Sequence, residues 1–117
     1  MNKRDKIVLR KIIDEAAMIS LMLAGASESD FLRSEEKQRA VCMTLINIGE
    51  LVKNLTEDIR RNSPQVPWKD IAGLRDVAAH GYFTLRMDDI WIYATKELPI
   101  CSKQIEKILQ SAESDNL

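Results

Sequence analysis

Apolar residues recur at helical spacing along most of the chain. The first such stretch predicts a helix over residues 3–24, with one apolar face formed by Leu9, Ile12, Ile13, Ala16, Ile19 and Leu23. Gly25 follows and predicts its end. Residues 25–34 are predicted to be a connector that carries Phe31 and Leu32 as an apolar plug. The sequence contains no sustained alternation of apolar and polar residues, the pattern that is typical of a strand.

A second helix is predicted to begin after Ser34, a good N-cap residue that is followed by two glutamates. Its apolar residues repeat in steps of four and three, as in the seam of a bundle: Val41, Leu45, Ile48, Val52 and Leu55. Gly49 lies inside this helix, where glycine costs about 1 kcal/mol relative to alanine. Close approach of another backbone would explain it. Met43 and Ile46 point away from the seam, either as scattered surface residues or as a contact face for a second protomer.

Proline and glycine positions divide the remainder of the chain. Residues 60–66 are predicted to be a turn, and Pro67 is predicted to open a third helix that ends at Gly81. Asp88 or Asp89 is expected to cap a short fourth helix, which Leu98-Pro99 breaks to open a fifth. The apolar stripe of that last helix comprises Ile100, Cys101, Gln104, Ile105, Ile108 and Leu109, and residues 111–117 are expected to fray. The predicted fold is an all-α, up-and-down bundle of four to five helices in one domain, residues 1–117.

Composition narrows the functional classes. Apolar residues make up 45% and charged residues 30% of the 117 positions, as in ordinary soluble proteins. The 17 basic residues are balanced by 18 acidic ones, so any RNA contact must come from a local patch. Residues 1–10 are too polar for a signal peptide, and no apolar run approaches the roughly 20 residues of a membrane span. We therefore expect a cytoplasmic protein with reduced core thiols at Cys42 and Cys101, and no membrane or DNA partner.

The third predicted helix contains an arginine in an unexpected place. On an ideal helix Arg75 falls within the apolar arc formed by Trp68, Ile71, Ala72, Leu74, Ala78 and Ala79. Burying an unpaired guanidinium is costly. Either the side chain reaches out of the arc, or the arc borders a cleft that uses a fixed positive charge. Gly81 leaves His80, the only histidine, in the last turn, with Tyr82 just beyond it.

These residue types suit RNA cleavage without a metal, which needs proton transfer and positive charge at phosphorus. Histidine can move protons near neutral pH, and an arginine fork can bind two phosphate oxygens. On an ideal helix, however, Arg75 and His80 point about 140° apart. One histidine per chain also leaves a second proton-transfer group unassigned, which a two-fold dimer would supply. The alternative is that His80 only caps the helix dipole, with Asp76 as its partner.

The motif Arg75-x4-His80-x-Tyr82, with Pro67-Trp68 before it and the triplet Ile48-Gly49-Glu50, resembles the HEPN superfamily. More narrowly, it resembles the HepT-like toxins, which are the ribonuclease halves of toxin–antitoxin pairs with a minimal nucleotidyltransferase. The resemblance covers roughly residues 5–109. Asp76 stands where this family commonly has asparagine.

The resemblance implies a homodimeric, metal-independent endoribonuclease toxin of a type VII-like toxin–antitoxin system, without a cofactor. Arg75 and His80 would be catalytic at the dimer interface, Asp76 would support the imidazole, and tRNA or mRNA would be the substrate. The cognate nucleotidyltransferase antitoxin would silence the toxin by adenylylating Tyr82. The alternative is a non-catalytic helical dimer that binds a nucleotidyltransferase through the same surface, which the near-neutral charge favours.

Overall fold

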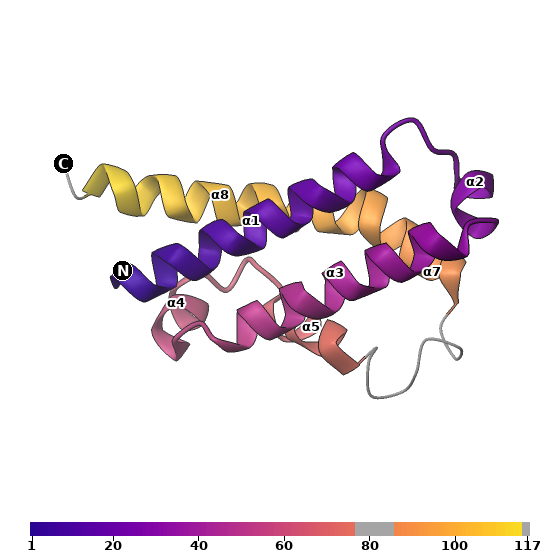
Figure 1. The fold of residues 1–117 in the computed structure, drawn as a ribbon. Coiled ribbons are helices and arrows are strands. Elements are labelled where there is room, and N and C mark those ends of the chain that lie inside the picture. Colours follow the sequence, from indigo (N-terminus) through magenta and orange to yellow (C-terminus); the bar gives the residue numbers. More distant parts are fainter. Residues whose placement is uncertain (77–85, 116–117) are drawn as a thin grey trace.

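Three long helices form the body of the molecule (Figure 1). In the computed structural model, which describes residues 1–76 and 86–115, α1 (Lys3–Leu23) packs against both α3 (Glu35–Lys53) and α8 (Leu98–Asp115). Short helical segments fill the connections, and no strand occurs in the described ranges. The predicted all-α bundle is confirmed. No helix within these ranges is long and apolar enough to cross a membrane.

The first helix agrees with its predicted boundaries. Asn2 caps it by accepting a hydrogen bond from the backbone N–H of Asp5 at 2.7 Å. The helix ends at Leu23, and Gly25 follows with a positive φ of 76°, a conformation that suits glycine. Asp5 is almost fully buried and accepts hydrogen bonds from the backbone N–H and the hydroxyl of Thr56, at 3.1 and 2.6 Å. This pair holds the start of α1 against the start of α4.

The predicted connector between the first two long helices contains a short helix, α2 (Glu28–Leu32). Its start is held by a capping box, in which Ser27 and Asp30 each accept a hydrogen bond from the other's backbone N–H. Phe31 is fully buried, and its ring centroid lies 5.6 Å from that of Trp91. The apolar plug is therefore confirmed for Phe31. It is wrong for Leu32, which is 43% exposed.

The region predicted to be a turn also begins with a helix, α4 (Glu57–Asn62). The chain then turns and enters α5 (Trp68–Ala72). The Trp68 indole N–H donates a 2.9 Å hydrogen bond to the carbonyl oxygen of Ser63, which fixes the turn against α5. Only the second half of the predicted turn is therefore irregular.

The third predicted helix does not continue as one α-helix. At Gly73 the chain tightens into a 3₁₀ turn, η1 (Gly73–Arg75). A 3₁₀ turn advances about 120° per residue rather than 100°, so positions after Ala72 leave the register of an ideal α-helix. The predicted end at Gly81, together with Ala78 and Ala79, lies outside the described residues.

The last part of the chain differs from prediction in two ways. The helix α7 (Met87–Ile92) begins after Arg86, so Asp88 and Asp89 lie in its first turn and do not cap it. A π-helical turn, η3 (Tyr93–Glu97), then leads directly into α8. Leu98-Pro99 therefore does not break the helix. Proline removes a hydrogen bond to the residue four before it, and the wider π turn at that point accommodates this loss.

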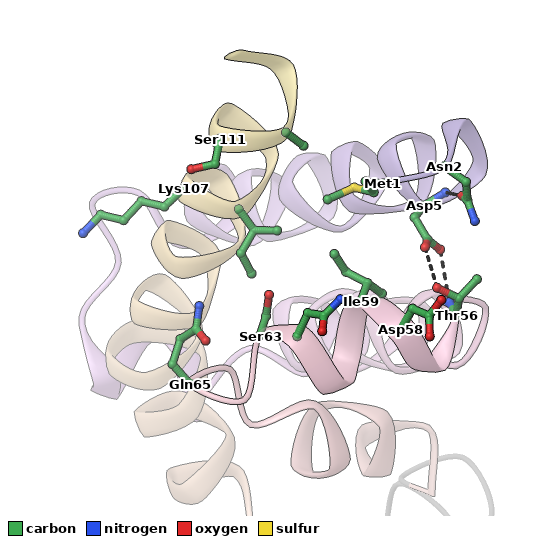
Figure 2. A pocket seen from close by; sticks show the side chains of 13 residues that line it. Met1, Asn2, Asp5, Thr56, Asp58, Ile59, Ser63, Gln65, Lys107 and Ser111 are labelled. Atoms are coloured by element: carbon green, nitrogen blue, oxygen red, sulfur yellow. Dashed lines mark hydrogen bonds between the residues drawn. The ribbon is translucent and has the colours of Figure 1, made fainter. Parts of the chain in front are cut away.

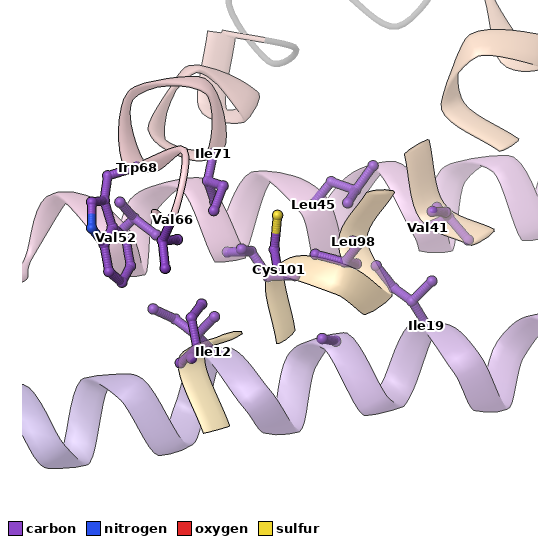
Figure 3. Close-up of a cluster of buried hydrophobic side chains, with 14 of the residues drawn as sticks. Ile12, Ile19, Val41, Leu45, Val52, Val66, Trp68, Ile71, Leu98 and Cys101 are labelled. Atoms are coloured by element: carbon purple, nitrogen blue, oxygen red, sulfur yellow. The ribbon is translucent and has the colours of Figure 1, made fainter. Parts of the chain in front are cut away.

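The core lies between α1, α3, α5 and α8 (Figure 3). The predicted seam is confirmed for Val41, Leu45, Ile48 and Val52, which lie on α3 and are fully buried; Leu55 is also buried, at 3% exposed, but lies beyond the end of α3 at Lys53. Cys42 and Cys101 are free and buried, as predicted, and burial raises the pKa of both thiols. Ile100 was expected on the apolar stripe of α8 but is 61% exposed, and α8 continues through residues expected to fray.

Candidate active site

Gly49 is the point where η1 meets α3. A Cβ atom at Gly49 would lie 2.7 Å from the backbone nitrogen of Arg75 and 3.1 Å from the carbonyl oxygen of Ile71. Such distances are far below van der Waals contact, so any larger residue would push η1 away from α3. The prediction of a close backbone approach is confirmed. The structure adds that the approaching backbone is that of Arg75.

The Arg75 side chain reaches away from the core and is 43% exposed. Its Nη1 lies 3.7 Å from Glu50 Oε1, and its Nε lies 3.8 Å from Asp76 Oδ1. Both separations are ion-pair distances and exceed those of hydrogen bonds. Within the described ranges, the N–H donors of the guanidinium therefore form no hydrogen bonds. The side chain is therefore not buried among the described residues, and the cleft bordered by the apolar arc, which includes Ala78 and Ala79, stays a prediction.

Glu50 joins the candidate site through its position beside Arg75, and the sequence alone indicates no role for it. Its carboxylate is 55% exposed and lies beside the guanidinium of Arg75. The signal was present in the triplet Ile48-Gly49-Glu50: the glycine admits η1, and the next residue of α3 then meets the side chain that η1 carries. What the sequence could not show was which arginine this carboxylate would meet.

The remaining predicted site residues are placed only in part. Asp76 is 62% exposed and lies next to Arg75. His80 and Tyr82 lie outside the described residues. Their convergence with Arg75, and the support of the imidazole by Asp76, therefore stay predictions.

A hollow of 500 Å³ adjoins Glu50 between α1 and α3. Its charged residues are Asp14, Glu15, Glu50 and Lys11, which makes three carboxylates against one ammonium. A net negative lining disfavours a phosphate. This side of Arg75 is therefore a poor place for an RNA backbone.

A hollow of 740 Å³ lies elsewhere, between the start of α1, α4 and the end of α8 (Figure 2). It contains none of the predicted site residues. Its buried carboxylate, Asp5, is already engaged by Thr56 and serves the fold. In residues 1–76 and 86–115, no group of three or more His, Cys, Asp or Glu side chains could hold a metal ion.

The chain has two tyrosines, and Tyr93 is the one that the structure describes. Its phenol oxygen is buried and has no hydrogen-bond partner among the described residues. Burial raises the pKa of this phenol, with a smaller contribution from Cys101. The oxygen of Tyr93 is thus both shielded and hard to ionise.

Comparison with known proteins places this chain in a family. The family model described as "Ribonuclease HepT-like" matches residues 12–108, which include both Glu50 and Arg75. The chain belongs to the HepT-like ribonuclease family. The predicted enzyme class, ribonuclease, is confirmed at the level of that family.

Individual relatives agree with this assignment. The protein "Putative RNase TTE0752" of Caldanaerobacter subterraneus subsp. tengcongensis is 38% identical over 92% of this chain and 96% of its own length. The "Probable ribonuclease HepT" of Thermococcus cleftensis is 30% identical over 92% of this chain and 98% of its own length. No solved structure matches the chain.

Proposed function

We propose that this protein is a cytoplasmic, metal-independent endoribonuclease toxin whose catalytic residues are Arg75 and His80. Its substrate is RNA, with tRNA and mRNA as the candidate targets. The observation that carries the proposal is the Arg75 side chain. A close backbone contact at Gly49 presents it at the surface, with its donors free of hydrogen bonds to the described residues. Family membership supplies the reaction class.

In the proposed reaction, the substrate's own 2′-hydroxyl attacks the adjacent phosphorus. One imidazole accepts the hydroxyl proton, the bond from phosphorus to the 5′ oxygen breaks, and a second group protonates that oxygen. The products are a 2′,3′-cyclic phosphate and a 5′-hydroxyl end. Arg75 binds the non-bridging oxygens through two parallel N–H donors and stabilises the extra negative charge of the phosphorane. His80 carries out the proton transfer.

A two-fold dimer supplies the second proton-transfer group in this proposal. Along α3, Met43 is 58% exposed two turns before Glu50, and Ile46 is half-buried one turn before it. An outward apolar stretch that leads to the Glu50–Arg75 pair supports an interface that includes the site. Each protomer would then contribute one His80 and one Arg75 to a shared groove.

The cleavage assay on Arg75 variants tests the enzyme proposal. Arg75→Ala should reduce the cleavage rate by at least about 100-fold, and Arg75→Lys should restore only part of it because an ammonium lacks the planar fork. Arg33→Ala is the matched control, since this arginine is 75% exposed at the end of α2. Wild-type rates in Arg75→Ala or in His80→Ala would refute the catalytic assignment.

We further propose that a cognate minimal nucleotidyltransferase silences the toxin by adding AMP to Tyr82. The shielded phenol of Tyr93 supports this choice between the two tyrosines. An adenylyl group beside the site would place a phosphodiester anion in competition for the Arg75 fork.

Intact-mass spectrometry after incubation with the nucleotidyltransferase and ATP tests the modification. Tyr82→Phe should remain unmodified and active, whereas the control Tyr93→Phe should still acquire the adduct and lose activity. An adduct that persists in Tyr82→Phe contradicts the assignment of the modified residue.

A further inference from the structure

A hollow of 380 Å³ lies between α4 and α5, away from the acidic hollow beside Glu50. Its charged residues are Arg60, Arg61, Lys69 and Glu57, so three cations face one carboxylate. Trp68 and Ala72 complete the lining. In a chain with balanced total charge, such a local excess of positive charge is the feature that attracts a polyanion.

Two of these cations have no hydrogen-bond or ion-pair partner for their side chains among the described residues. Arg61 Nη2 lies 3.5 Å from Glu57 Oε2, so the single carboxylate of the hollow is already neutralised. Arg60 and Lys69 form no side-chain hydrogen bond or ion pair with any residue of the described ranges, unlike Arg33 or Arg86. Arg60 is half-buried, Lys69 is exposed, and both residues line the same hollow.

The hollow is lined by a residue close along the chain to Arg75. Ala72, at its edge, immediately precedes η1, which carries Arg75 at its end. Three residues of 3₁₀ helix rise only about 6 Å. A single strand that places one phosphate on Arg75 can therefore reach Lys69 and Arg60 without leaving the surface formed by α4, α5 and η1.

The opposite direction of approach is unfavourable. The hollow on the α1–α3 side of the Glu50–Arg75 pair carries a charge of −2, from three carboxylates and one lysine. The hollow on the α4–α5 side carries +2, from three cations and one glutamate. Arg75 is thus linked to one hollow through Glu50 and to the other through Ala72, and a phosphate backbone is repelled by the first and attracted to the second.

We infer that the α4–α5 hollow is the docking surface for the single-stranded RNA backbone that flanks the cut site, with Arg60 and Lys69 binding phosphate. The inference rests on the proposed ribonuclease function. It adds the path of the RNA strand, which reaches Arg75 by crossing α4 and α5 and not along the hollow between α1 and α3. These contacts are made to phosphate and therefore set affinity, without specifying base sequence.

Binding of a short single-stranded 2′-O-methyl RNA, measured by fluorescence anisotropy over a range of salt concentrations, tests this inference. The probe cannot be cut by 2′-hydroxyl attack, so binding is separated from catalysis. The double variant Arg60→Gln/Lys69→Gln should bind on the order of tenfold more weakly at low salt. Its slope of log affinity against log salt should be smaller by about 1.4, or about 0.7 for each lost phosphate contact.

Two controls make the outcome specific. Arg33→Gln/Lys103→Gln removes the same charge from α2 and α8 and should bind like the wild type. Arg60→Lys/Lys69→Arg retains the charge and should keep the affinity, which excludes a loss through misfolding. A wild type that does not bind the probe, or equal affinities in the two glutamine variants, overturns the docking surface. Absence of cleavage of unmodified RNA, with the binding pattern intact, overturns only the proposed enzymatic function.

Discussion

Leu45 and Gly49 are one turn apart on α3, and they meet their neighbours in opposite ways. Leu45 is fully buried in the apolar cluster shared by α1, α3, α5 and α8. Gly49 contacts the backbone of α5 and η1, with no space for even a methyl group. The contact at Leu45 depends on the volume of its side chain, whereas the contact at Gly49 depends on the absence of a side chain. The comparison indicates that stability and site geometry are specified by different residues of one helix.

The two contacts also differ in what a change would disturb. A smaller residue at Leu45 leaves a cavity that the surrounding apolar side chains can partly fill. A larger residue at Gly49 displaces backbone, and the displaced segment carries Arg75. In the proposed reaction the guanidinium meets a phosphate through two parallel donors, so a shift of about 1 Å there should lower the cleavage rate.

The largest effect on stability is expected for Leu45→Ala. Removing a fully buried leucine side chain should lower the free energy of unfolding by about 2–5 kcal/mol. Urea denaturation followed by circular dichroism measures it. The fraction that remains folded should cut RNA at nearly the wild-type rate; a large loss of activity per folded molecule would break the distinction between the two contacts.

Compared with Leu45→Ala, Gly49→Ala should have a smaller effect on stability and a larger effect on the cleavage rate. Overpacking is expected to cost about 1–3 kcal/mol, partly offset by the better helix propensity of alanine. The cleavage rate of the folded protein should nevertheless fall about 100-fold, because Arg75 is displaced. Thermal melting and single-turnover cleavage on the same sample separate the two effects. Wild-type cleavage by Gly49→Ala would show that the backbone contact does not position the site.

Glu50→Gln tests the effect of the α3 carboxylate that lies beside Arg75. An exposed ion pair at 3.7 Å contributes at most about 1 kcal/mol, so the unfolding transition should hardly move. Without the competing carboxylate, Arg75 should bind substrate phosphate more tightly, and KM should fall by up to about fivefold. A collapse of kcat at unchanged KM would instead give Glu50 a part in the chemistry.

The smallest effect concerns the thiol of Cys42, which lies on the core side of the same helix and is 3% exposed. Burial raises the pKa of this thiol, so less reactive thiolate is present at any pH below that value. Labelling with a thiol reagent should be slow in the native protein and quicken as pH rises. Leu45→Ala should accelerate it through local opening, and Gly49→Ala should not. Equal acceleration in both variants would mean that the two contacts are not independent.

Much of the fold follows from local patterns in the chain. The seam of α3 could be predicted from steps of four and three residues, and the end of α1 from Gly25, because periodicity and backbone freedom act over a few residues. The short helices α2 and α4 were missed since five or six residues contain too little periodicity to be recognised. The continuation through Pro99 was missed because a π turn compensates for the proline.

The candidate site, like the fold, could be predicted from the sequence only in part. The sequence by itself determined that Arg75 is unusual, that Gly49 requires a close neighbour, and that the family motif surrounds both. Only the tertiary structure decided that this neighbour is the Arg75 backbone and that Glu50 meets the guanidinium. It also decided that the chain tightens into a 3₁₀ turn before Arg75 and that the Arg75 side chain is 43% exposed. The physical reason is that helix periodicity is a local property, whereas a contact between positions 49 and 75 depends on how the intervening turn packs α5 against α3.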